Sequence, residues 1–401
     1  MTLERARFLA ASALLLAACG EAKESLGPPA EIASPAAPGS TAPNLATGGD
    51  GRVYLSWTEP RPDSAHALRF AVLEGGRWSA PRTVAEGRGW FVNWADFPSI
   101  LPLEGGALAA HWLQRNGAGK YAYEVRVARS ADGGATWGPS VVPHRDGAAA
   151  EHGFVSMWAT GGDSVGVAWL DGRKYAGRAE GAPGAETAVM STTLAPDGGM
   201  APETPLDPRA CDCCQTAMAA TADGPLVAYR DRTADEIRDI YITRRTAAGW
   251  SAPGPVHADG WKIPACPVNG PALAARGRRV AIAWFTAARD TARVNVAFSD
   301  DAGATWSAPV RVDGGTPAGH ADVELTDGGA LVSWIERTGA GPTELRVRRV
   351  ARDGTLGEPR ALGGVPERSV PRMALDRDAV VFAWSAPGKP SRVQTARMEL
   401  Q

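Results

Sequence analysis

The sequence predicts an all-β protein, a β-propeller built from four-stranded blades. The main observation is a short apolar strand that ends in Trp or Tyr and recurs seven times, 50 to 60 residues apart. Turn signals rich in Gly, Asp and Pro separate the repeats, and the repeated body shows no helical periodicity. The aromatic residues that end the seven strands are Trp57, Trp112, Trp169, Tyr229, Trp284, Trp334 and Trp384.

Each repeat has the same internal order, which accounts for four strands. An entry segment precedes the aromatic-ended strand, and a polar loop, a third strand such as "EVRVARS" or "VNVAFS", a turn and a short "SAP" strand follow it. Seven repeats favour seven blades, with six as the alternative. The last repeat, from Val370 to Leu400, holds only three clear strands, so we expect the segment near Ile32 to supply the fourth. Pairing the two chain ends in this way closes the ring and removes exposed sheet edges.

The N-terminus has the anatomy of a targeting signal. Arg5 and Arg7 precede an apolar run, residues 8–18, that is too short for a permanent membrane-spanning helix and ends in "LAAC". This pattern resembles a bacterial lipoprotein signal, which implies that residues 1–18 are removed and that Cys19 carries the lipid. An ordinary secretory signal cut nearby is the alternative, and both export the protein.

The domain organisation follows from the change in composition after this signal. Residues 19–42 are rich in Pro, Ala, Gly and Ser and are expected to form a lipidated flexible tether, and residues 43–401 a single propeller domain. The protein is therefore expected in the bacterial cell envelope, bound to a membrane through its N-terminal lipid. The outer membrane, facing the periplasm or the cell surface, is the expected location.

Two of the predicted turns carry a family pattern. "SADGGATW" from Ser130 and "SDDAGATW" from Ser299 match Ser-x-Asp-x-Gly-x-Thr-Trp, in which the Asp accepts backbone N–H groups and the Gly permits positive φ. These turns resemble the Asp-box (BNR) repeats of sialidase-like propellers, and the resemblance covers nearly the whole mature chain. It implies recognition, and in an enzyme hydrolysis, of a glycan. The arginine of the family's Arg-Ile-Pro type motif is absent here, so the resemblance transfers no catalytic set, and enzymatic activity stays open.

Charge and composition exclude some partners. The formal net charge is −2, without the basic excess that nucleic-acid binding requires. We therefore expect no nucleic-acid partner. The resemblance to sialidase-like propellers and the expected export imply a glycan, a small anionic ligand or an envelope protein as the binding partner, and the protein is expected to be a monomer.

Topology predicts where a site would lie. In a propeller, the entries to the innermost strands and the loops after the second strands share one face around the central channel. The entry positions are Asn44, Asp96, His152, Cys213 or Cys214, Cys266, His320 and Arg368. The expected ligand-binding residues are Trp94, Asp96, His152, Arg230, Arg232, His320 and Arg368. The candidate catalytic residues are Asp96, Tyr175, Arg173, Arg230, Asp231, Arg232 and Glu236, without a nucleophile–base pair that spacing alone can assign.

Four tryptophans fall outside the repeat frame and are therefore candidates for ligand stacking as well as for packing. They are Trp90, Trp94, Trp158 and Trp261.

The cysteines of "RACDCCQTAMA" permit two interpretations. With Cys19 lipidated, Cys211, Cys213, Cys214 and Cys266 remain, and exported proteins usually oxidise an even number. Because a bond between adjacent cysteines is strained, Cys211–Cys214 with Cys213–Cys266 is the easier pairing. The alternative is a copper or zinc site made by these thiolates with His152 or His320, although no metal cofactor is favoured.

Three functions follow: a sialidase-like protein that recognises or cleaves a glycan, a non-catalytic envelope scaffold, and a metal-handling protein.

Overall fold

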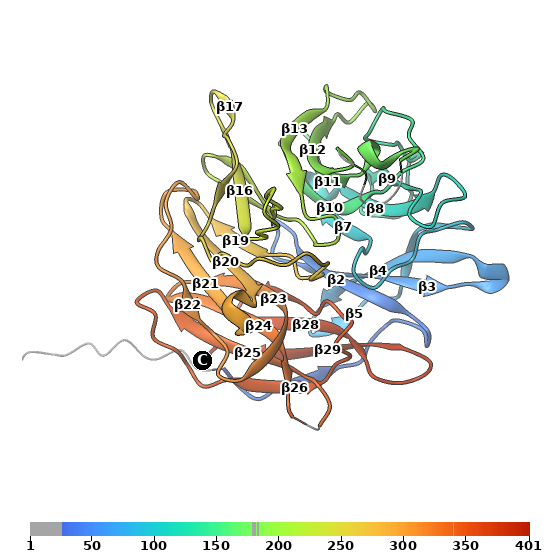
Figure 1. Ribbon diagram of the computed structural model, residues 1–401. Helices are drawn as coiled ribbons and strands as arrows, with labels where there is room; N and C mark the ends of the chain where they lie inside the picture. The colour runs from blue at the N-terminus through green and yellow to red at the C-terminus, as the bar shows by residue number, and fades with distance from the viewer. Residues whose placement is uncertain (1–25, 179–181, 183, 340) are drawn as a thin grey trace, which may run out of the picture.

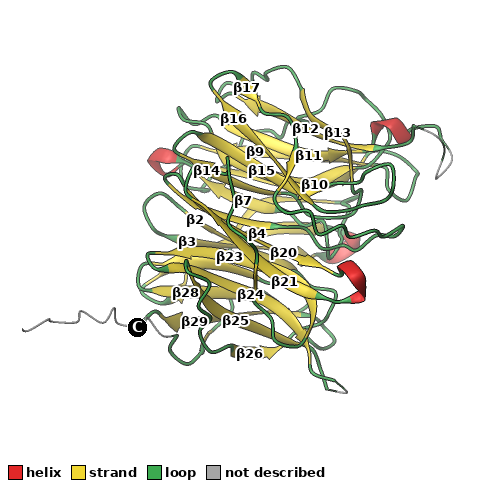
Figure 2. Cartoon of the chain, turned by 60° about the vertical axis from the view of Figure 1, so that its left-hand side comes forward, coloured by secondary structure: helices red, strands yellow, loops and turns green. Residues whose placement is uncertain are grey.

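The computed structural model describes residues 26–401, except 179–181, 183 and 340. Its described residues form seven antiparallel sheets arranged as the blades of a propeller. The innermost strands β2, β7, β10, β14, β19, β23 and β27 contact one another in sequence, and β27 returns to β2. In Figure 1 the colour runs around the ring with the sequence, and Figure 2 shows that strands dominate the molecule. The all-β, seven-bladed prediction is confirmed, and the six-bladed alternative is wrong.

The blades follow one another along the chain. Blade one contains β2 (Thr41–Thr47), β3 (Val53–Pro60), β4 (His66–Glu74), β5 (Arg77–Trp78) and β6 (Arg82–Gly87). Blade two contains β7 (Ser99–Pro102), β8 (Leu108–Arg115) and β9 (Tyr123–Ser130), and blade three β10 (His152–Ala159), β11 (Val165–Asp171), β12 (Thr187–Leu194) and β13 (Thr204–Ala210). Blade four contains β14 (Ala217–Thr221), β15 (Gly224–Arg230), β16 (Ile240–Thr246), β17 (Gly249–Trp250) and β18 (Gly254–Pro255).

The remaining blades complete the ring. Blade five contains β19 (Ala272–Arg276), β20 (Arg279–Thr286), β21 (Arg293–Ser299) and β22 (Val310–Arg311), and blade six β23 (Thr316–Thr326), β24 (Gly329–Arg337), β25 (Glu344–Ala351) and β26 (Arg360–Gly364). Blade seven contains β27 (Arg372–Asp376), β28 (Ala379–Ala386), β29 (Arg392–Glu399) and β1 (Ala30–Ile32). Four short 3-10 helices lie in the connections: η1 (Pro62–Ser64), η2 (Glu104–Gly106), η3 (Arg173–Tyr175) and η4 (Ala288–Asp290).

Ring closure occurs between the two ends of the chain, as predicted. Strand β1 pairs with β29, with Ile32 opposite Thr395, and the Thr395 hydroxyl donates to the carbonyl of Ile32 at 2.7 Å. An isolated bridge between Leu26 and Leu400 extends this pairing. The edge of the seventh blade is therefore covered by an N-terminal strand.

The expected signal peptide, residues 1–18, and Cys19 lie outside the described residues. Within the part of the chain that is described, no helix is long and apolar enough to cross a membrane.

The repeat aromatics form the core, and several carry a matched acidic partner. Trp169 and Trp334 are fully buried or nearly so, and a buried indole N–H requires an acceptor. The Trp169 N–H donates to Asp171 at 2.8 Å, and that of Trp334 to Glu336 at 2.6 Å. An acidic residue two positions after the aromatic, at the end of the same strand, therefore accepts the hydrogen bond that the buried indole N–H requires.

The Asp-box turns lie on the face opposite the strand entries, because Ser299 at the end of β21 pairs with Val280 near the start of β20. Asp301 accepts the Thr305 N–H at 2.8 Å and its hydroxyl at 2.7 Å. Gly303 has φ +79°, and a Cβ there would lie 2.8 Å from a Leu226 methyl group. The glycine is thus required by both backbone conformation and space.

Asp301→Ala is expected to lower the melting temperature by about 1–3 °C, because two hydrogen bonds of one turn are lost. Thermal unfolding followed by circular dichroism measures this. Asp300→Ala is the matched control, since its exposed pair with Arg352 contributes little. Equal melting temperatures for the two variants would contradict a stabilising role for the turn.

Candidate functional site

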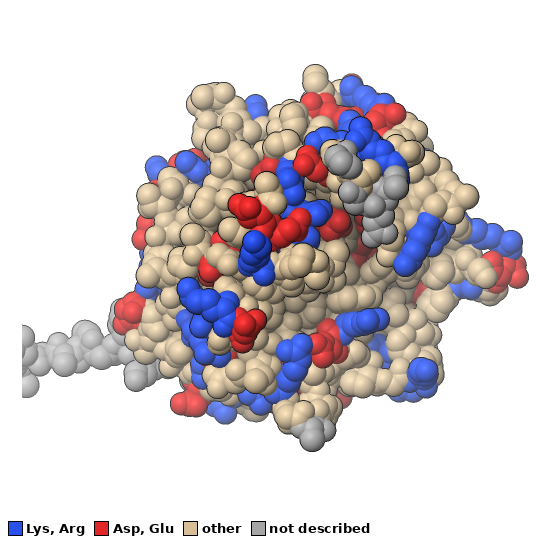
Figure 3. All heavy atoms as spheres, in the orientation of Figure 1, with Lys and Arg blue, Asp and Glu red and all other residues tan. Residues whose placement is uncertain are grey.

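The strand entries and the loops after the second strands share one face, here called the loop face. The register shows this directly: His152 at the start of β10 pairs with Asp171 at the end of β11, and Thr316 of β23 pairs with Arg337 of β24. Figure 3 views this face and shows acidic and basic side chains interspersed, without a large patch of one sign. The predicted candidates therefore do lie on one face.

Some polar entry residues connect adjacent blades. Asp96 accepts the backbone N–H of Phe154 at 2.8 Å, and Asn269 accepts that of His320 at 2.6 Å. Phe154 and His320 have φ of 51° and 52°, a left-handed conformation that is uncommon for such residues. One carboxylate oxygen of Asp96 is therefore committed to holding blade three against blade two.

The loop face is hollowed by a cavity of about 580 Å³ between blades two to five, here called the main cavity. Aromatic side chains form its walls: Phe91, Trp94, Tyr121 and Tyr175. Three hydrogen-bonded groups also line it, Asp96, Tyr123 and Glu151, and three groups come from the cysteine-bearing loops, Asp212, Cys213 and Cys266. Apolar walls with a few converging polar groups are typical of a small-ligand site.

Tyr123 joins two carboxyl groups beside this cavity. Its hydroxyl oxygen lies 2.7 Å from Asp96 Oδ2 and 2.8 Å from Glu151 Oε1. A Cβ on Gly153 would lie 2.0 Å from Asp96 Oδ2, so only glycine permits this close approach. Asp96 and Tyr123 are buried, whereas Glu151 is partly exposed to the cavity.

The environment of these groups favours their neutral forms. Burial raises the pKa of Asp96 to about 7, against the lowering by its hydrogen bonds from Tyr123 and Phe154. Burial and the nearby Asp96 charge raise the pKa of Glu151 to about 8, although its bond from Tyr123 opposes this. Burial also raises the pKa of Tyr123 well above its usual range. Because one O–H donates to one acceptor at a time, a protonated carboxyl group completes the second bond, and the three groups share protons near neutral pH.

A second cavity of about 510 Å³ adjoins the first, since Trp94 and Val268 line both. It contains the predicted residues His320 and Arg368 together with Trp261. The His320 ring packs edge-on against Trp94 with centroids 5.5 Å apart, and burial lowers its pKa to about 4. The structure thus places Trp94, His320 and Arg368 together.

Of the four tryptophans outside the repeat frame, two line the two cavities just described and two pack against other tryptophans. Trp94 and Trp261 line the cavities. Trp90 stacks on Trp112, and Trp158 packs edge-on against Trp250. Trp94 and Trp261 are therefore the two placed to stack on a ligand in these loop-face cavities.

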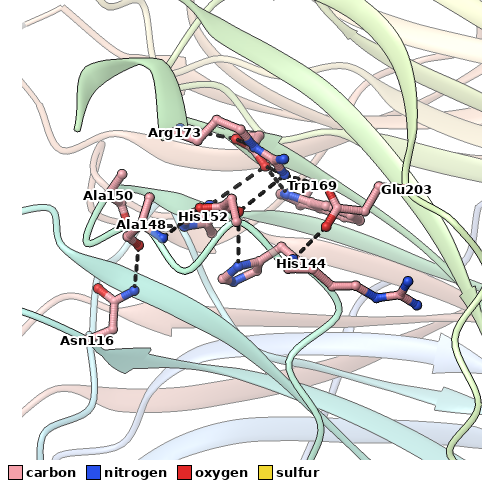
Figure 4. Close-up of polar contacts among 11 residues, drawn as sticks. Asn116, His144, Ala148, Ala150, His152, Trp169, Arg173 and Glu203 are labelled. Carbon is pink, nitrogen blue, oxygen red and sulfur yellow. Dashed lines mark hydrogen bonds and ion pairs between the residues drawn. The ribbon is translucent and has the colours of Figure 1, made fainter.

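His152 belongs to a separate polar cluster in blade three (Figure 4). Its ring stacks on His144 with centroids 3.7 Å apart, and its Nε2 lies 3.1 Å from Asp146. Burial alone would lower the pKa of His152, but the hydrogen bond to Asp146 and the charge of Asp171 raise it. Burial and the charge of His152 lower the pKa of His144 to about 3.

Arg173 completes this cluster and neutralises its acidic groups. Its guanidinium pairs with Asp171 and Glu203, both at 2.6 Å, and lies 3.3 Å from Asp146. The ligand atoms of His144, Asp146 and His152 lie within 4.8 Å of one another, but the Arg173 cation shares the Asp146 carboxylate. His152, an expected ligand-binding residue, and Arg173, a candidate catalytic residue, thus both lie in an ion-pair network in this structure.

Arg230 is not on the ligand-accessible surface. It is 1% exposed, and its guanidinium donates to the carbonyl oxygens of Asn269, Arg238 and Phe285 at 2.6–2.9 Å. Its charge also lies over the Trp261 ring. The structure does not support the expected ligand-binding role of Arg230, because its donors join blades four and five.

The neighbouring candidates are also paired. Arg232 binds Glu236 at 2.8 Å, and Glu236 also accepts from Arg238 at 2.9 Å. Burial raises the pKa of Asp231 to about 7, but Asp231 does not line the main cavity. Tyr175 does line it, about half-buried, and burial raises its pKa.

The four cysteines meet at the entries of blades four and five. Cys211 Sγ lies 3.5 Å from Cys214 Sγ and 3.7 Å from Cys213 Sγ, and all four thiols are free. Cys213, Cys266 and Asp212 form a second group with ligand atoms within 4.8 Å. The expected proximity of Cys213 and Cys266 is therefore present, whereas no group among the described residues joins a cysteine to His152 or His320.

Sequence reasoning missed Tyr123 and Glu151. Tyr123 stands directly before the third-strand segment "EVRVARS", and Glu151 stands directly before the chosen His152. The blade topology could have indicated Tyr123, because the third strand of a blade begins at the loop face. The pairing of Tyr123 with Arg115 at the end of β8 shows this.

Comparison with known proteins identifies the architecture but no family. No protein-family model and no curated protein matches the chain. A protein of unknown function from Dyadobacter fermentans is similar in structure at 14% identity, with a TM-score of 0.51 over 94% of this chain and 99% of that one. The polysaccharide lyase Uly1 is similar at 9% identity, with a TM-score of 0.51 over 90% of both chains.

More distant structural matches include sialidase and arabinofuranosidase propellers. A Hadza microbial sialidase has 14% identity and a TM-score of 0.44, over 74% of this chain and 63% of that one. At such identities the likeness concerns the fold. The chain is thus a seven-bladed β-propeller of an architecture that carbohydrate-active enzymes also use.

Proposed function

We propose that the main cavity binds a neutral glycan and that Glu151 transfers protons to and from a glycosidic bond. The observation that carries this proposal is the hydrogen-bonded set of Asp96, Tyr123 and Glu151 beside an aromatic-walled cavity of about 580 Å³. Aromatic faces offer apolar surface to the C–H face of a sugar ring, and paired carboxyl groups suit glycoside chemistry.

The three groups have different roles in this proposal. Glu151, the most exposed, donates its proton to the glycosidic oxygen while the C–O bond breaks. Water adds to the anomeric carbon, and its proton returns to the Glu151 carboxylate. Tyr123 and Asp96 hold Glu151 in place, and Asp96 helps to keep its pKa near 8, so that the acid is present at neutral pH.

The charges of the site favour a neutral sugar over a sialic acid. Asp96, Glu151 and Asp212 line the cavity. In their neutral form such carboxyl groups offer no positive charge to an anionic ligand, and in their ionised form they repel it. Arg230 is turned to backbone carbonyls, and Arg232 is paired with Glu236, so neither supports a carboxylate-binding arginine cluster. We further propose that the protein acts in the bacterial cell envelope, attached through Cys19.

A panel of fluorogenic glycosides tests this function. The mature chain is expected to cleave a neutral glycoside, and Glu151→Gln to lower kcat by at least about 100-fold, because general acid catalysis contributes about 10²–10⁴-fold. Glu104→Gln, in an exposed turn at the other end of blade two, is the matched control and should leave the rate unchanged.

Cleavage of sialosides alone would contradict the neutral-glycan assignment. Binding of an oligosaccharide without turnover, with equal affinities for the parent chain and Glu151→Gln, would contradict catalysis and support a binding scaffold.

A further inference from the structure

The cysteine cluster is a second chemical centre, distinct from the hydrogen-bonded carboxyl groups. Cys211, Cys213 and Cys214 lie in the entry to blade four, and Cys266 lies in the entry to blade five. Cys211 and Cys214 are each 1% exposed, Cys213 lines the main cavity, and Cys266 is exposed at its rim. Cys213 and Cys214 are adjacent in the sequence and Cys211 is two residues before them, so the three sulfurs lie around one point.

The distances between the sulfurs suit a shared metal ion. Two thiolates bound to one ion at about 2.3 Å lie roughly 3.8 Å apart, whereas disulfide-bonded sulfurs lie about 2.0 Å apart. The Cys211 sulfur lies 3.5 Å from that of Cys214 and 3.7 Å from that of Cys213. The sulfurs of Cys211, Cys213 and Cys214 all lie within 4.8 Å of one another, so a single ion can reach all three.

The protein also supplies positive charge behind the cluster. Arg238 is buried, and its guanidinium donates to the Cys211 sulfur at 3.1 Å, while Glu236 holds the other end of the guanidinium at 2.9 Å. A cation fixed at this distance compensates part of the charge of several thiolates in a buried site. The Arg238 cation therefore stabilises the deprotonated form of the Cys211 sulfur, which is the form that binds metal.

We propose that Cys211, Cys213 and Cys214 bind one Cu(I) ion. Thiolates are soft ligands that select Cu(I), zinc or iron–sulfur clusters, and three enclosed thiolates match the low coordination number of Cu(I) better than the four ligands of structural zinc. Cys266 and Asp212 lie close to Cys213 and line the main cavity, so they lie on the cavity side of the proposed ion.

Anaerobic titration of the reduced mature chain with Cu(I), in competition with a colorimetric Cu(I) chelator, tests this site. The expected result is one tightly held Cu(I) per chain, with an ultraviolet thiolate-to-copper absorption band. Cys214→Ser and Cys211→Ser are expected to weaken binding by at least 100-fold, and Cys266→Ser by less than about 5-fold.

His257→Ala, which removes an exposed histidine that pairs with Asp259 and does not belong to the cysteine cluster, is the control and should bind Cu(I) as the parent chain does. Circular dichroism of each serine variant separates lost binding from lost fold. A serine variant that folds and still binds Cu(I) like the parent chain would overturn the proposal.

Two other results would also overturn it. One is cysteines that take up no alkylating reagent in protein isolated from the envelope, together with a mass two or four hydrogens below that of the reduced chain, which would show disulfides. The other is retention of Zn(II) in preference to Cu(I). The glycoside assay has an independent readout, so failure of one proposal leaves the other in place.

Discussion

Glu151→Gln is expected to be more stable than the parent chain at pH 8–9, although it loses glycoside cleavage. The folded pKa of Glu151 is about 8, against an ordinary value of 4.5, because the carboxyl group is buried. The folded protein therefore holds a proton between about pH 4.5 and 8 that the unfolded chain has released. Since stability falls with rising pH wherever the folded state binds more protons, this group destabilises the fold progressively through that window and fully above it.

The sign and size of the effect follow from this linkage. Each pKa unit corresponds to about 1.4 kcal/mol, so the shift of Glu151 amounts to several kcal/mol at pH 8–9. Asp96, whose pKa is raised to about 7, adds a similar decline between about pH 4 and 7. Glutamine cannot ionise and keeps a polar partner for the Tyr123 hydroxyl. The variant should therefore gain relative stability only as the pH rises.

Urea unfolding of the parent chain and Glu151→Gln at pH 5, 7 and 9 measures this difference. Glu104→Gln should follow the parent chain at every pH, because Glu104 lies in an exposed turn. If the free energy of unfolding of Glu151→Gln fell with pH as steeply as that of the parent chain, Glu151 would be ionised throughout and unsuited to act as an acid.

The blade architecture could be predicted from sequence because its signals are local and repeated. Trp169 and Trp334 stand at the same place in their repeats and are buried in the same way, each with an acidic partner two residues later. Ring closure near Ile32 was also predictable, because the last repeat lacked one strand and an exposed edge is unfavourable.

The candidate site was harder to predict because its contacts cross between blades. Tyr123 belongs to the third strand of blade two, whereas Glu151 belongs to the entry of blade three, and no local pattern couples them. Cys213 and Cys266 were predictable as neighbours, because both stand at the entries of adjacent blades.

The expectation that Arg230 binds a ligand lacks support for a different physical reason. The sequence shows only that Arg230 directly follows the core aromatic Tyr229 at the end of a strand. In a propeller, neighbouring blades cover both faces of a strand, so both Tyr229 and Arg230 are buried. The buried guanidinium is stabilised because it donates to three backbone carbonyls that need donors at this blade junction.

Arg230→Ala is therefore expected to destabilise the fold by about 4 kcal/mol without a specific effect on ligand binding. The substitution leaves the carbonyls of Asn269, Arg238 and Phe285 without their donor, and each buried unsatisfied group costs about 1–3 kcal/mol. It also opens a cavity beside Trp261, where the guanidinium lay over the ring. Arg230→Lys should recover part of the loss, because one ammonium group cannot reach all three carbonyls in the planar geometry of arginine.

Arg232→Ala is the matched comparison two residues away. Arg232 is about a quarter exposed and pairs with Glu236 at 2.8 Å at the surface, so its loss should cost less than about 1 kcal/mol. Urea unfolding of the three variants, with glycan binding measured on the folded fraction, decides between the two roles of Arg230. A stable Arg230→Ala that has lost ligand binding would return this arginine to the ligand site, whereas a destabilised variant whose folded fraction binds normally identifies it as the junction between blades four and five.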